Sequence, residues 1–171
     1  MSAIGSKQEK GQRNSISVKN IKVFFSDVDG VLTDAGMYYS ENGDELKKFC
    51  TYDGMAFKLL QNVGIKVGII TTEDTILNRR RSKKLGLDFD FHGALDKLQV
   101  IKDFCAKEKV KLKEIAYIGD DINCFDLLTN VGLAACPKNA VNKIKSISNI
   151  IQLNKKGGEG VVREFVELIL E

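Results

Sequence analysis

The sequence predicts an α/β fold: a doubly wound parallel sheet with a β-hairpin insertion and no cap domain. Short apolar runs, typical of buried parallel strands, alternate with longer stretches of helical periodicity. Several of these runs end in Gly, Thr or Asp, where ligands gather beyond parallel strands. Thr71 follows Asp27 by 44 positions and Lys97 follows Thr71 by 26. Neither gap holds a separate cap, because a folded domain needs at least about 50 residues.

The expected elements follow from this alternation. A strand over 22–26 precedes a hairpin near 37–49, whose turn is Asn42-Gly43, a pair favoured in two-residue hairpin turns. Further apolar runs of about four residues predict strands at 66–70, 89–91, 115–118, 132–135 and 149–152. Apolar residues three and four positions apart predict helices at 53–63, 75–85, 96–107, 123–130, 139–145 and 159–170. Strands that alternate with helices favour right-handed crossovers and a parallel sheet.

Composition restricts the class of protein. Residues 1–20 are polar and are expected to form a flexible leader, whereas residues 21–171 are expected to form one domain. The leader lacks the apolar region of a secretory signal, and no run of eighteen apolar residues predicts a membrane span. The four cysteines lack metal-type spacing, which favours reduced thiols in the cytoplasm. The net charge of +3 comes from scattered Lys and Arg, so no nucleic-acid partner is expected.

Two acids follow the first apolar run. Asp27 and Asp29 come just after the expected strand 22–26 and its apolar run 23–25, at the carboxyl end of a buried strand. One such carboxylate can attack phosphorus while the other protonates the leaving oxygen, and Gly30 allows the tight turn that directs both inward. A calcium loop is excluded because Tyr38 occupies the twelfth position, where that loop needs Glu. A plain surface turn with two acids is the alternative.

A second apolar run, 115–118, also ends in acids, at Asp120 and Asp121. Together with the first pair, four carboxylates are expected at neighbouring strand ends, where they would repel one another unless a cation joined them. Mg²⁺ is the natural cation because it prefers oxygen ligands from carboxylates and phosphates.

Two further strand ends carry groups suited to phosphate. Thr71 and Thr72 follow strand 66–70, and the Thr71 hydroxyl and backbone N–H can hold a phosphate oxygen. Lys97 stands at a helix start, where its ammonium group can neutralise charge on a transferring phosphoryl group. Taken singly, such residues are mostly solvated surface, and only their order along the chain makes them notable.

In that order, the motifs resemble those of the haloacid dehalogenase superfamily of phosphohydrolases, from Ile21 to about Glu167. The match consists of Asp-x-Asp-Gly-x-x-Thr at 27–33, then Thr71, Lys97 and Gly-Asp-Asp at 119–121. The nearest likeness is to the small, capless group that dephosphorylates 3-deoxy-octulosonate 8-phosphate and nonulosonate (sialic-type) 9-phosphates. Segments similar to this group are 29–34, 52–55, 96–98 and 156–165.

The resemblance implies a role for each motif residue. Asp27 would be the nucleophile and Asp29 the acid/base, while Thr71 and Lys97 would bind the phosphoryl group. The implied Mg²⁺ site comprises Asp27, the Val28 carbonyl, Asp29, Asp120 and, near the metal, Asp121. The residues assigned to substrate binding are Thr33, Thr72, Glu73, Arg81, Lys84 and Arg163.

Glu73 decides the expected substrate. By resemblance, octulosonate-phosphate phosphatases usually have Gly-Arg at this position. The nonulosonate 9-phosphate type has Glu followed by a basic helix, and this chain is similar to that type because Arg81 and Lys84 follow Glu73. An acid would accept hydrogen bonds from sugar hydroxyls or an amide, and the cations would pair with the substrate carboxylate. A nonulosonate 9-phosphate is therefore expected. Alternatives are 3-deoxy-D-manno-octulosonate 8-phosphate, and a non-catalytic oligomerisation module of sialic acid activation.

The roles of Glu73 and of the basic helix have purely structural alternatives. Glu73 could merely cap the following helix, and the basic run 79–84 could be a solvated helix face.

This chain departs from the resembled family at Cys124, where the family usually has an Asp. The loss of this acid is expected to matter little because Asp120 can still bind magnesium.

The missing cap predicts a site that lies open in a monomer. The resembled group typically forms homotetramers, and this likeness implies that the tail segment 155–163 enters a neighbour's site, where Arg163 would contact the sugar acid. The alternative for the glycines at 157, 158 and 160 is a flexible connector into a docking helix.

Overall fold

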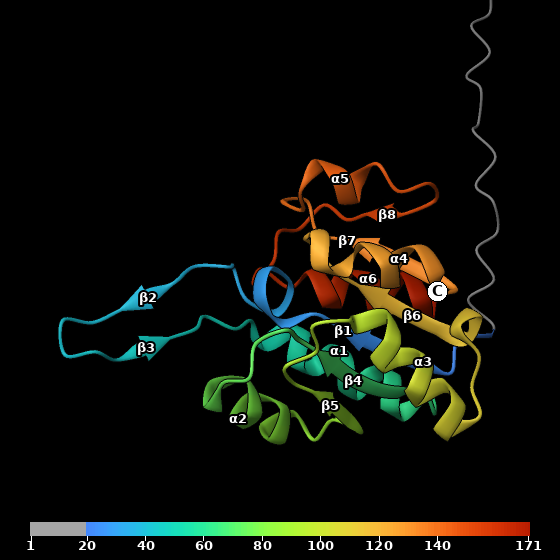
Figure 1. The fold of residues 1–171 in the computed structure, drawn as a ribbon, viewed down its shortest axis with the longest axis horizontal. Helices are drawn as coiled ribbons and strands as arrows, with labels where there is room; N and C mark the ends of the chain where they lie inside the picture. Colours follow the sequence, from blue (N-terminus) through green and yellow to red (C-terminus); the bar gives the residue numbers. More distant parts are fainter. Residues whose placement is uncertain (1–19) are drawn as a thin grey trace, which may run out of the picture.

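A six-stranded parallel sheet forms the centre of the domain in the computed structural model, which describes residues 20–171 (Figure 1). The expected leader lies outside these residues, apart from Asn20. From one edge to the other, the sheet consists of β5 (Phe89–Phe91), β4 (Lys66–Ile70), β1 (Val23–Ser26), β6 (Ile115–Ile118), β7 (Leu133–Cys136) and β8 (Ile151–Gln152). All the pairs are parallel, which confirms the doubly wound fold. The strand order reverses between β1 and β6, where ligands bind in such sheets.

Helices cover both faces of the sheet because successive side chains of β1 point to opposite sides. Phe24 packs against Phe57 and Phe165, with ring centroids 5.9 and 5.7 Å away, whereas Phe25 meets Phe104 at 5.2 Å on the other face. The helices that form the two layers are α1 (Thr51–Asn62), α2 (Ile76–Leu85), α3 (Lys97–Glu108), α4 (Phe125–Asn130), α5 (Asn142–Lys145) and α6 (Val161–Leu170). Within residues 20–171, none of the helices has the length and apolar character needed to cross a bilayer.

The inserted hairpin consists of β2 (Tyr38–Tyr39) and β3 (Glu45–Leu46), and it projects from the body of the domain (Figure 1). Its turn lies at the expected Asn-Gly pair, where Gly43 has a φ of 86° and donates its N–H to the Ser40 carbonyl. The described residues contain no further insertion that could act as a cap.

Three of the helices begin two or three residues later than expected. Helix α4 begins at Phe125 rather than 123, because residues Ile122–Cys124 form a 3₁₀ helix. Helix α5 begins at Asn142 rather than 139, because residues 137–140 close a turn in which the Ala140 N–H bonds to the Pro137 carbonyl. Helix α6 begins at Val161 rather than 159, because Gly160 has a φ of 89°, which an α-helix does not admit.

The glycine-rich segment before α6 is buried within its own protomer. A Cβ on Gly157 would lie 1.9 Å from the Gly30 carbonyl oxygen, and the Gly158 N–H donates to the Val31 carbonyl at 2.9 Å. Helix α6 then places Val162 and Phe165 in the core beside α1. The prediction that this segment enters a neighbouring site is therefore wrong for residues 157–163, because their removal would open the protein's own core.

Asp53 connects the segment 52–55 to the tail segment 156–165, the two parts of the chain that resemble the same family group. Its carboxylate is fully buried and accepts the Arg163 N–H at 3.0 Å, so it caps the start of α6 from a neighbouring helix. Burial raises the pKa of Asp53 to about 6, although hydrogen bonds from the α6 backbone oppose the shift. Gly54 lets α1 approach Leu85 of α2 closely, since a Cβ there would lie 2.9 Å from the Leu85 side chain.

Candidate active site

An open cavity of about 260 Å³ lies at the carboxyl ends of β1, β4 and β6. Parallel strands deliver their carboxyl ends to one edge of the sheet, which is why residues far apart in the chain meet there. The sequence-derived candidates that line the cavity are Asp27, Asp29, Thr71, Thr72, Glu73, Asp120 and Asp121. It is also lined by Ala35, Gly36, Met37 and Asn123.

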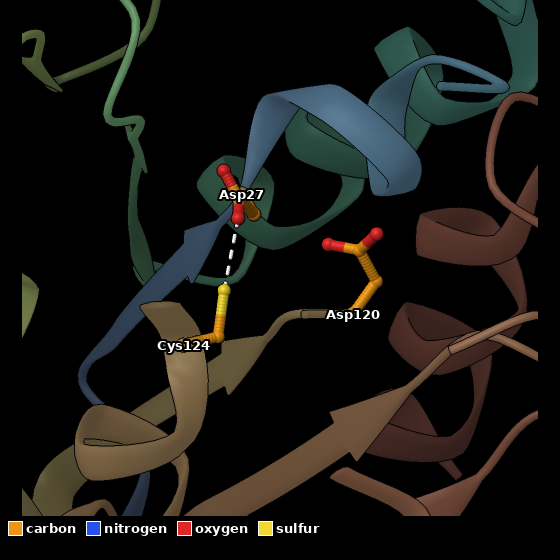
Figure 2. A group of neighbouring side chains, drawn as sticks. All are labelled: Asp27, Asp120 and Cys124. Carbon is orange, nitrogen blue, oxygen red and sulfur yellow. Dashed lines mark hydrogen bonds between the residues drawn. The ribbon is translucent and has the colours of Figure 1, made fainter. Parts of the chain in front are cut away.

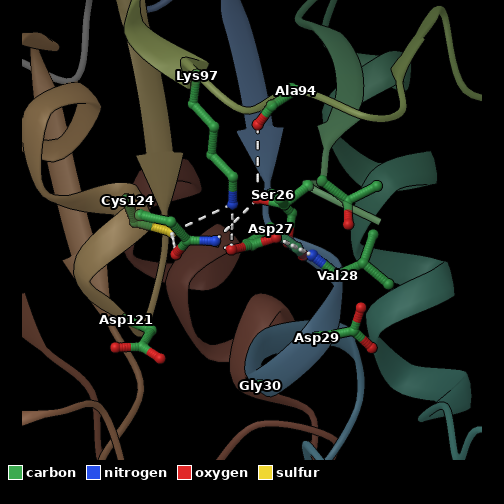
Figure 3. A network of polar contacts seen from close by, with 12 residues as sticks. Ser26, Asp27, Val28, Asp29, Gly30, Ala94, Lys97, Asp121 and Cys124 are labelled. Atoms are coloured by element: carbon green, nitrogen blue, oxygen red, sulfur yellow. Dashed lines mark hydrogen bonds and ion pairs between the residues drawn. The ribbon is translucent and has the colours of Figure 1, made fainter. Parts of the chain in front are cut away.

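Asp27 follows β1 directly and is 3% exposed (Figure 3). Its Oδ1 accepts the Val28 N–H at 2.7 Å, and its Oδ2 lies 2.5 Å from Lys97 Nζ and 2.9 Å from Cys124 Sγ. Burial of Lys97 disfavours its charge, but attraction and hydrogen bonds to Asp27 and Cys124 together outweigh this effect and raise the lysine pKa. The Asp27 carboxylate is thus anchored through both oxygens, with a permanent cation beside it.

The turn after Asp27, residues Val28–Leu32, sets the direction of Asp29. Gly30 has a φ of 81°, and Thr33 closes the turn by donating its N–H to the Val28 carbonyl at 3.0 Å. The Val28 carbonyl therefore keeps one lone pair for another ligand. Thr33 Oγ1 lies 3.3 Å from Gly30 N and 3.4 Å from Asp29 Oδ1. Thr33 supports the turn and does not line the cavity.

Lys47, which sequence reasoning missed, binds two of the candidate acids at once. It lies just after β3, and its Nζ donates to both oxygens of Asp29, at 2.7 and 2.9 Å, and to Glu73 Oε2 at 2.7 Å. Its side chain is only 4% exposed. Burial alone would lower the pKa of Lys47, but the hydrogen bonds that it donates to Asp29 and Glu73 raise it. No local signal distinguishes this lysine from its neighbours, because the hairpin brings it to the cavity from a distant part of the chain.

Asp120 lies beyond β6 against the turn after β1. A Cβ on Gly30 would lie 1.8 Å from Asp120 Oδ2, so only glycine leaves room for this carboxylate. Burial, followed by repulsion from Asp27 and Asp121, raises the pKa of Asp120 to about 7. This excess of negative charge and the carboxylate oxygens fit a divalent cation such as Mg²⁺. Asp121 is exposed, and its Oδ1 accepts a hydrogen bond from the Ile122 N–H at 2.7 Å.

The two threonines after β4 have different surroundings. Thr71 is buried, and its Oγ1 accepts the Glu73 N–H at 3.2 Å. Thr72 Oγ1 accepts a hydrogen bond from Asn123 Nδ2 at 2.9 Å. Asn123, a second residue that the sequence did not single out as part of the site, therefore ties the β4 and β6 sides of the cavity together.

Cys124 contacts Asp27 directly, with its Sγ 2.9 Å from Asp27 Oδ2. Its Sγ lies 3.1 Å from the Tyr117 hydroxyl, which donates to it, and 3.4 Å from Lys97 Nζ. Burial, followed by repulsion from Asp27, raises the pKa of the thiol to about 12. In this arrangement the residue is a neutral thiol that donates a hydrogen bond to Asp27.

Three basic candidates do not line the cavity. Arg81 donates to the Cys50 carbonyl at 3.1 Å and lies 5.2 Å from the centre of the Phe49 ring. Lys84 is exposed on α2, and Arg163 pairs with Glu167 one turn along α6 at 2.7 Å. Within one protomer these side chains serve packing or solvation, not the cavity.

Comparisons with known proteins agree with this geometry. A family model described as haloacid dehalogenase-like hydrolase matches residues 71–165. The chain is 33% identical over 154 residues to 3-deoxy-D-manno-octulosonate 8-phosphate phosphatase of Haemophilus influenzae, covering 90% of this chain and 85% of that protein.

Solved structures show the same likeness. The octulosonate phosphatase of Moraxella catarrhalis, in complex with a magnesium ion, a phosphate ion and the sugar acid, has a TM-score of 0.85 at 35% identity, with 90% of this chain and 87% of that chain covered. The cobalt-bound enzyme of Haemophilus influenzae has a TM-score of 0.83 at 33% identity, with 90% and 89% covered. These relatives are phosphatases, and the match over most of their length confirms that this chain belongs to the haloacid dehalogenase-like hydrolases.

Proposed function

We propose that this chain is a Mg²⁺-dependent phosphatase that hydrolyses the phosphate ester of a 3-deoxy sugar acid. The observation that carries the proposal is the buried Asp27, anchored through both oxygens at an open cavity beside Thr71 and Asp120. The first substrate to test is 3-deoxy-D-manno-octulosonate 8-phosphate, the substrate named for the curated relatives.

In this mechanism, an Asp27 oxygen attacks phosphorus and forms an aspartyl-phosphate while the ester bond to the sugar oxygen breaks. Asp29 donates a proton to that leaving oxygen, and later takes a proton from the water that hydrolyses the intermediate. Thr71 and Lys97 hold the phosphoryl oxygens and offset their charge.

The metal would be held chiefly by Asp27 and Asp120, with the second lone pair of the Val28 carbonyl and the nearby Asp121 as further oxygen donors. Asp29 belongs less to this set, because Lys47 already binds both of its oxygens. When bound, Mg²⁺ supplies positive charge that stabilises the transferring phosphoryl group.

Phosphate release from a panel of three esters tests the proposal: the octulosonate 8-phosphate, a nonulosonate 9-phosphate and phenyl phosphate. Turnover of phenyl phosphate alone would contradict the substrate class, whereas no turnover of any ester would contradict the phosphatase itself. A non-catalytic oligomerisation module is not favoured, because the residues for the chemistry meet in one cavity.

Lys47 is the residue that we expect to sense the substrate carboxylate. The charged residues that line the cavity are all acidic. Lys47 does not line the cavity itself but binds two of these acids, so a sugar acid would compete with Asp29 and Glu73 for its ammonium group. Lys47→Met should raise KM for the sugar acid phosphate at least about tenfold more than KM for phenyl phosphate, because a charged hydrogen bond is worth about 1.5–3 kcal/mol. Lys48→Met, at an exposed neighbour, is the matched control. Equal changes for both esters would contradict this role.

A nonulosonate 9-phosphate is the second candidate substrate, favoured by the position of Glu73. This carboxylate lines the cavity and is held by Lys47, which supports a role in contacting a bound substrate rather than one as a helix cap alone. Thr75, not Glu73, caps α2 by accepting the Asn78 N–H.

Glu73→Arg should lower kcat/KM for the nonulosonate 9-phosphate at least about tenfold more than for the octulosonate 8-phosphate, because a polar group left unpaired discriminates strongly. Glu73→Gln, which keeps an acceptor oxygen in place, should retain most of the preference. Steady-state kinetics on both esters make the comparison. Equal losses on the two substrates would remove Glu73 from substrate selection.

We further propose a homotetramer located in the cytoplasm. The projecting hairpin exposes Met37, Tyr39 and Leu46, each about 60% exposed, which suits burial against other subunits (Figure 1). The four cysteines are all free, as expected in a reducing compartment. Light scattering gives the mass of the assembly, and a stable monomer with full sugar-phosphate activity would contradict the tetramer.

A further inference from the structure

One group of side chains at the cavity combines two carboxylates with a thiol. A carboxylate oxygen of Asp27, a carboxylate oxygen of Asp120 and the Sγ of Cys124 all lie within 4.8 Å of one another. Figure 2 shows the three side chains. Asp27 comes from the end of β1 and Asp120 from the end of β6, while Cys124 closes the short 3₁₀ helix Ile122–Cys124 that turns back over them. Among the described residues, this is the only such group of potential metal ligands.

We propose that these three residues form a binding site for a thiophilic divalent ion such as Zn²⁺, which overlaps the Mg²⁺ site and excludes Mg²⁺ from it. Zn²⁺ accepts mixed sulfur and oxygen ligands, whereas Mg²⁺ prefers oxygen alone. The Cys124 thiol therefore distinguishes the two ions at a site where carboxylates bind both.

The geometry needs only a small adjustment. Zn²⁺ lies about 2.3 Å from sulfur and about 2.0–2.2 Å from carboxylate oxygen, so tetrahedral ligands are roughly 3.5 Å apart. Cys124 Sγ is 2.9 Å from Asp27 Oδ2 and would have to move away slightly, whereas the Asp120 ligand oxygen already lies within 4.8 Å of both other ligand atoms. A fourth position, towards the open cavity, remains for water or phosphate.

The charges also favour the ion. The two carboxylates of Asp27 and Asp120 face a single ammonium group among the described residues, that of Lys97, which lies 2.5 Å from Asp27 Oδ2 and 3.4 Å from Cys124 Sγ. When a divalent ion binds, the thiol proton leaves to solvent and the thiolate sulfur forms the metal bond. The bound ion engages Asp27, the proposed nucleophile, so it should inhibit the phosphatase.

Cobalt provides a spectroscopic test that needs no substrate. The metal-free protein, kept reduced with a phosphine, is titrated with Co²⁺, and a near-ultraviolet thiolate-to-cobalt charge-transfer band reports a sulfur ligand. We expect the band in the wild type and in Cys50→Ser, a matched control that removes a half-buried thiol outside the cavity. We expect no band in Cys124→Ser or in Cys124→Asp, which keeps an oxygen ligand if the serine variant fails to fold.

Calorimetry with Zn²⁺ and Mg²⁺ completes the test. Cys124→Ser should weaken Zn²⁺ binding at least about tenfold, in line with the loss of a metal-site residue, and change Mg²⁺ binding far less. A wild-type cobalt complex without the band would overturn the proposal, as would equal Zn²⁺ affinity in the wild type and a folded Cys124 variant. Because both measurements are binding experiments, their outcome is independent of which sugar acid phosphate the enzyme hydrolyses.

Discussion

Asp27→Asn is expected to lower kcat by more than about 100-fold on every phosphate ester, because an amide oxygen is a poor nucleophile. Loss of acid–base assistance alone costs about 10²–10⁴-fold, and removal of the attacking group should cost no less. Asp126→Asn is the matched control: it makes the same chemical change on an exposed part of α4. Initial rates of phosphate release provide the measurement.

The stability of this variant has to be measured with its activity. Lys97 is buried against Asp27, and removal of one partner of a buried ion pair typically costs about 3–5 kcal/mol. Circular dichroism and thermal unfolding show whether the variant is folded. In the wild type, rapid quenching with labelled substrate should trap phosphate on Asp27 as an acyl-phosphate. A folded Asp27→Asn variant that keeps more than about a hundredth of the wild-type kcat would refute the covalent mechanism. Failure to trap an acyl-phosphate in the wild type would refute it as well.

Removal of divalent metal is expected to reduce turnover to the background rate. Asp27, Asp120 and a dianionic phosphate ester would otherwise meet with too little compensating charge, as the raised pKa of Asp120 already indicates in the protein alone. Dialysis against EDTA followed by a rate assay with phenyl phosphate makes the measurement, and the control is the same dialysis without chelator.

Restoration of activity identifies the ion. Mg²⁺ should restore the rate, whereas Ca²⁺ should not, because Ca²⁺ takes more ligands at longer distances than a compact octahedral site provides. Undiminished activity after thorough chelation would remove the metal from the mechanism, and full restoration by Ca²⁺ would argue against a Mg²⁺-type site.

The sequence alone predicts the parallel sheet and those candidate residues of the cavity that lie at the ends of its strands. Asp27, Thr71 and Asp120 each lie within two positions of the end of an apolar run, and in a parallel sheet the ends of such runs converge whatever the loops do. Gly30 was also recognisable locally, although the reason that only glycine fits is its contact with Asp120, a residue 90 positions away.

Tertiary structure alone decided the contacts made by side chains from outside the strand ends. Lys47 reaches Asp29 and Glu73 only because the hairpin returns to the cavity, and no periodicity in its own segment encodes that distance. Arg81 was expected at the cavity but lies over Phe49, because the rotation of a helix about its axis is set by packing. The tail glycines form part of their own protomer's core because the turn after β1 leaves room for backbone only. Strand ends are placed by the hydrogen-bonded sheet and can be read from local pattern, whereas long side chains and loops are placed by contacts between segments that the sequence keeps apart.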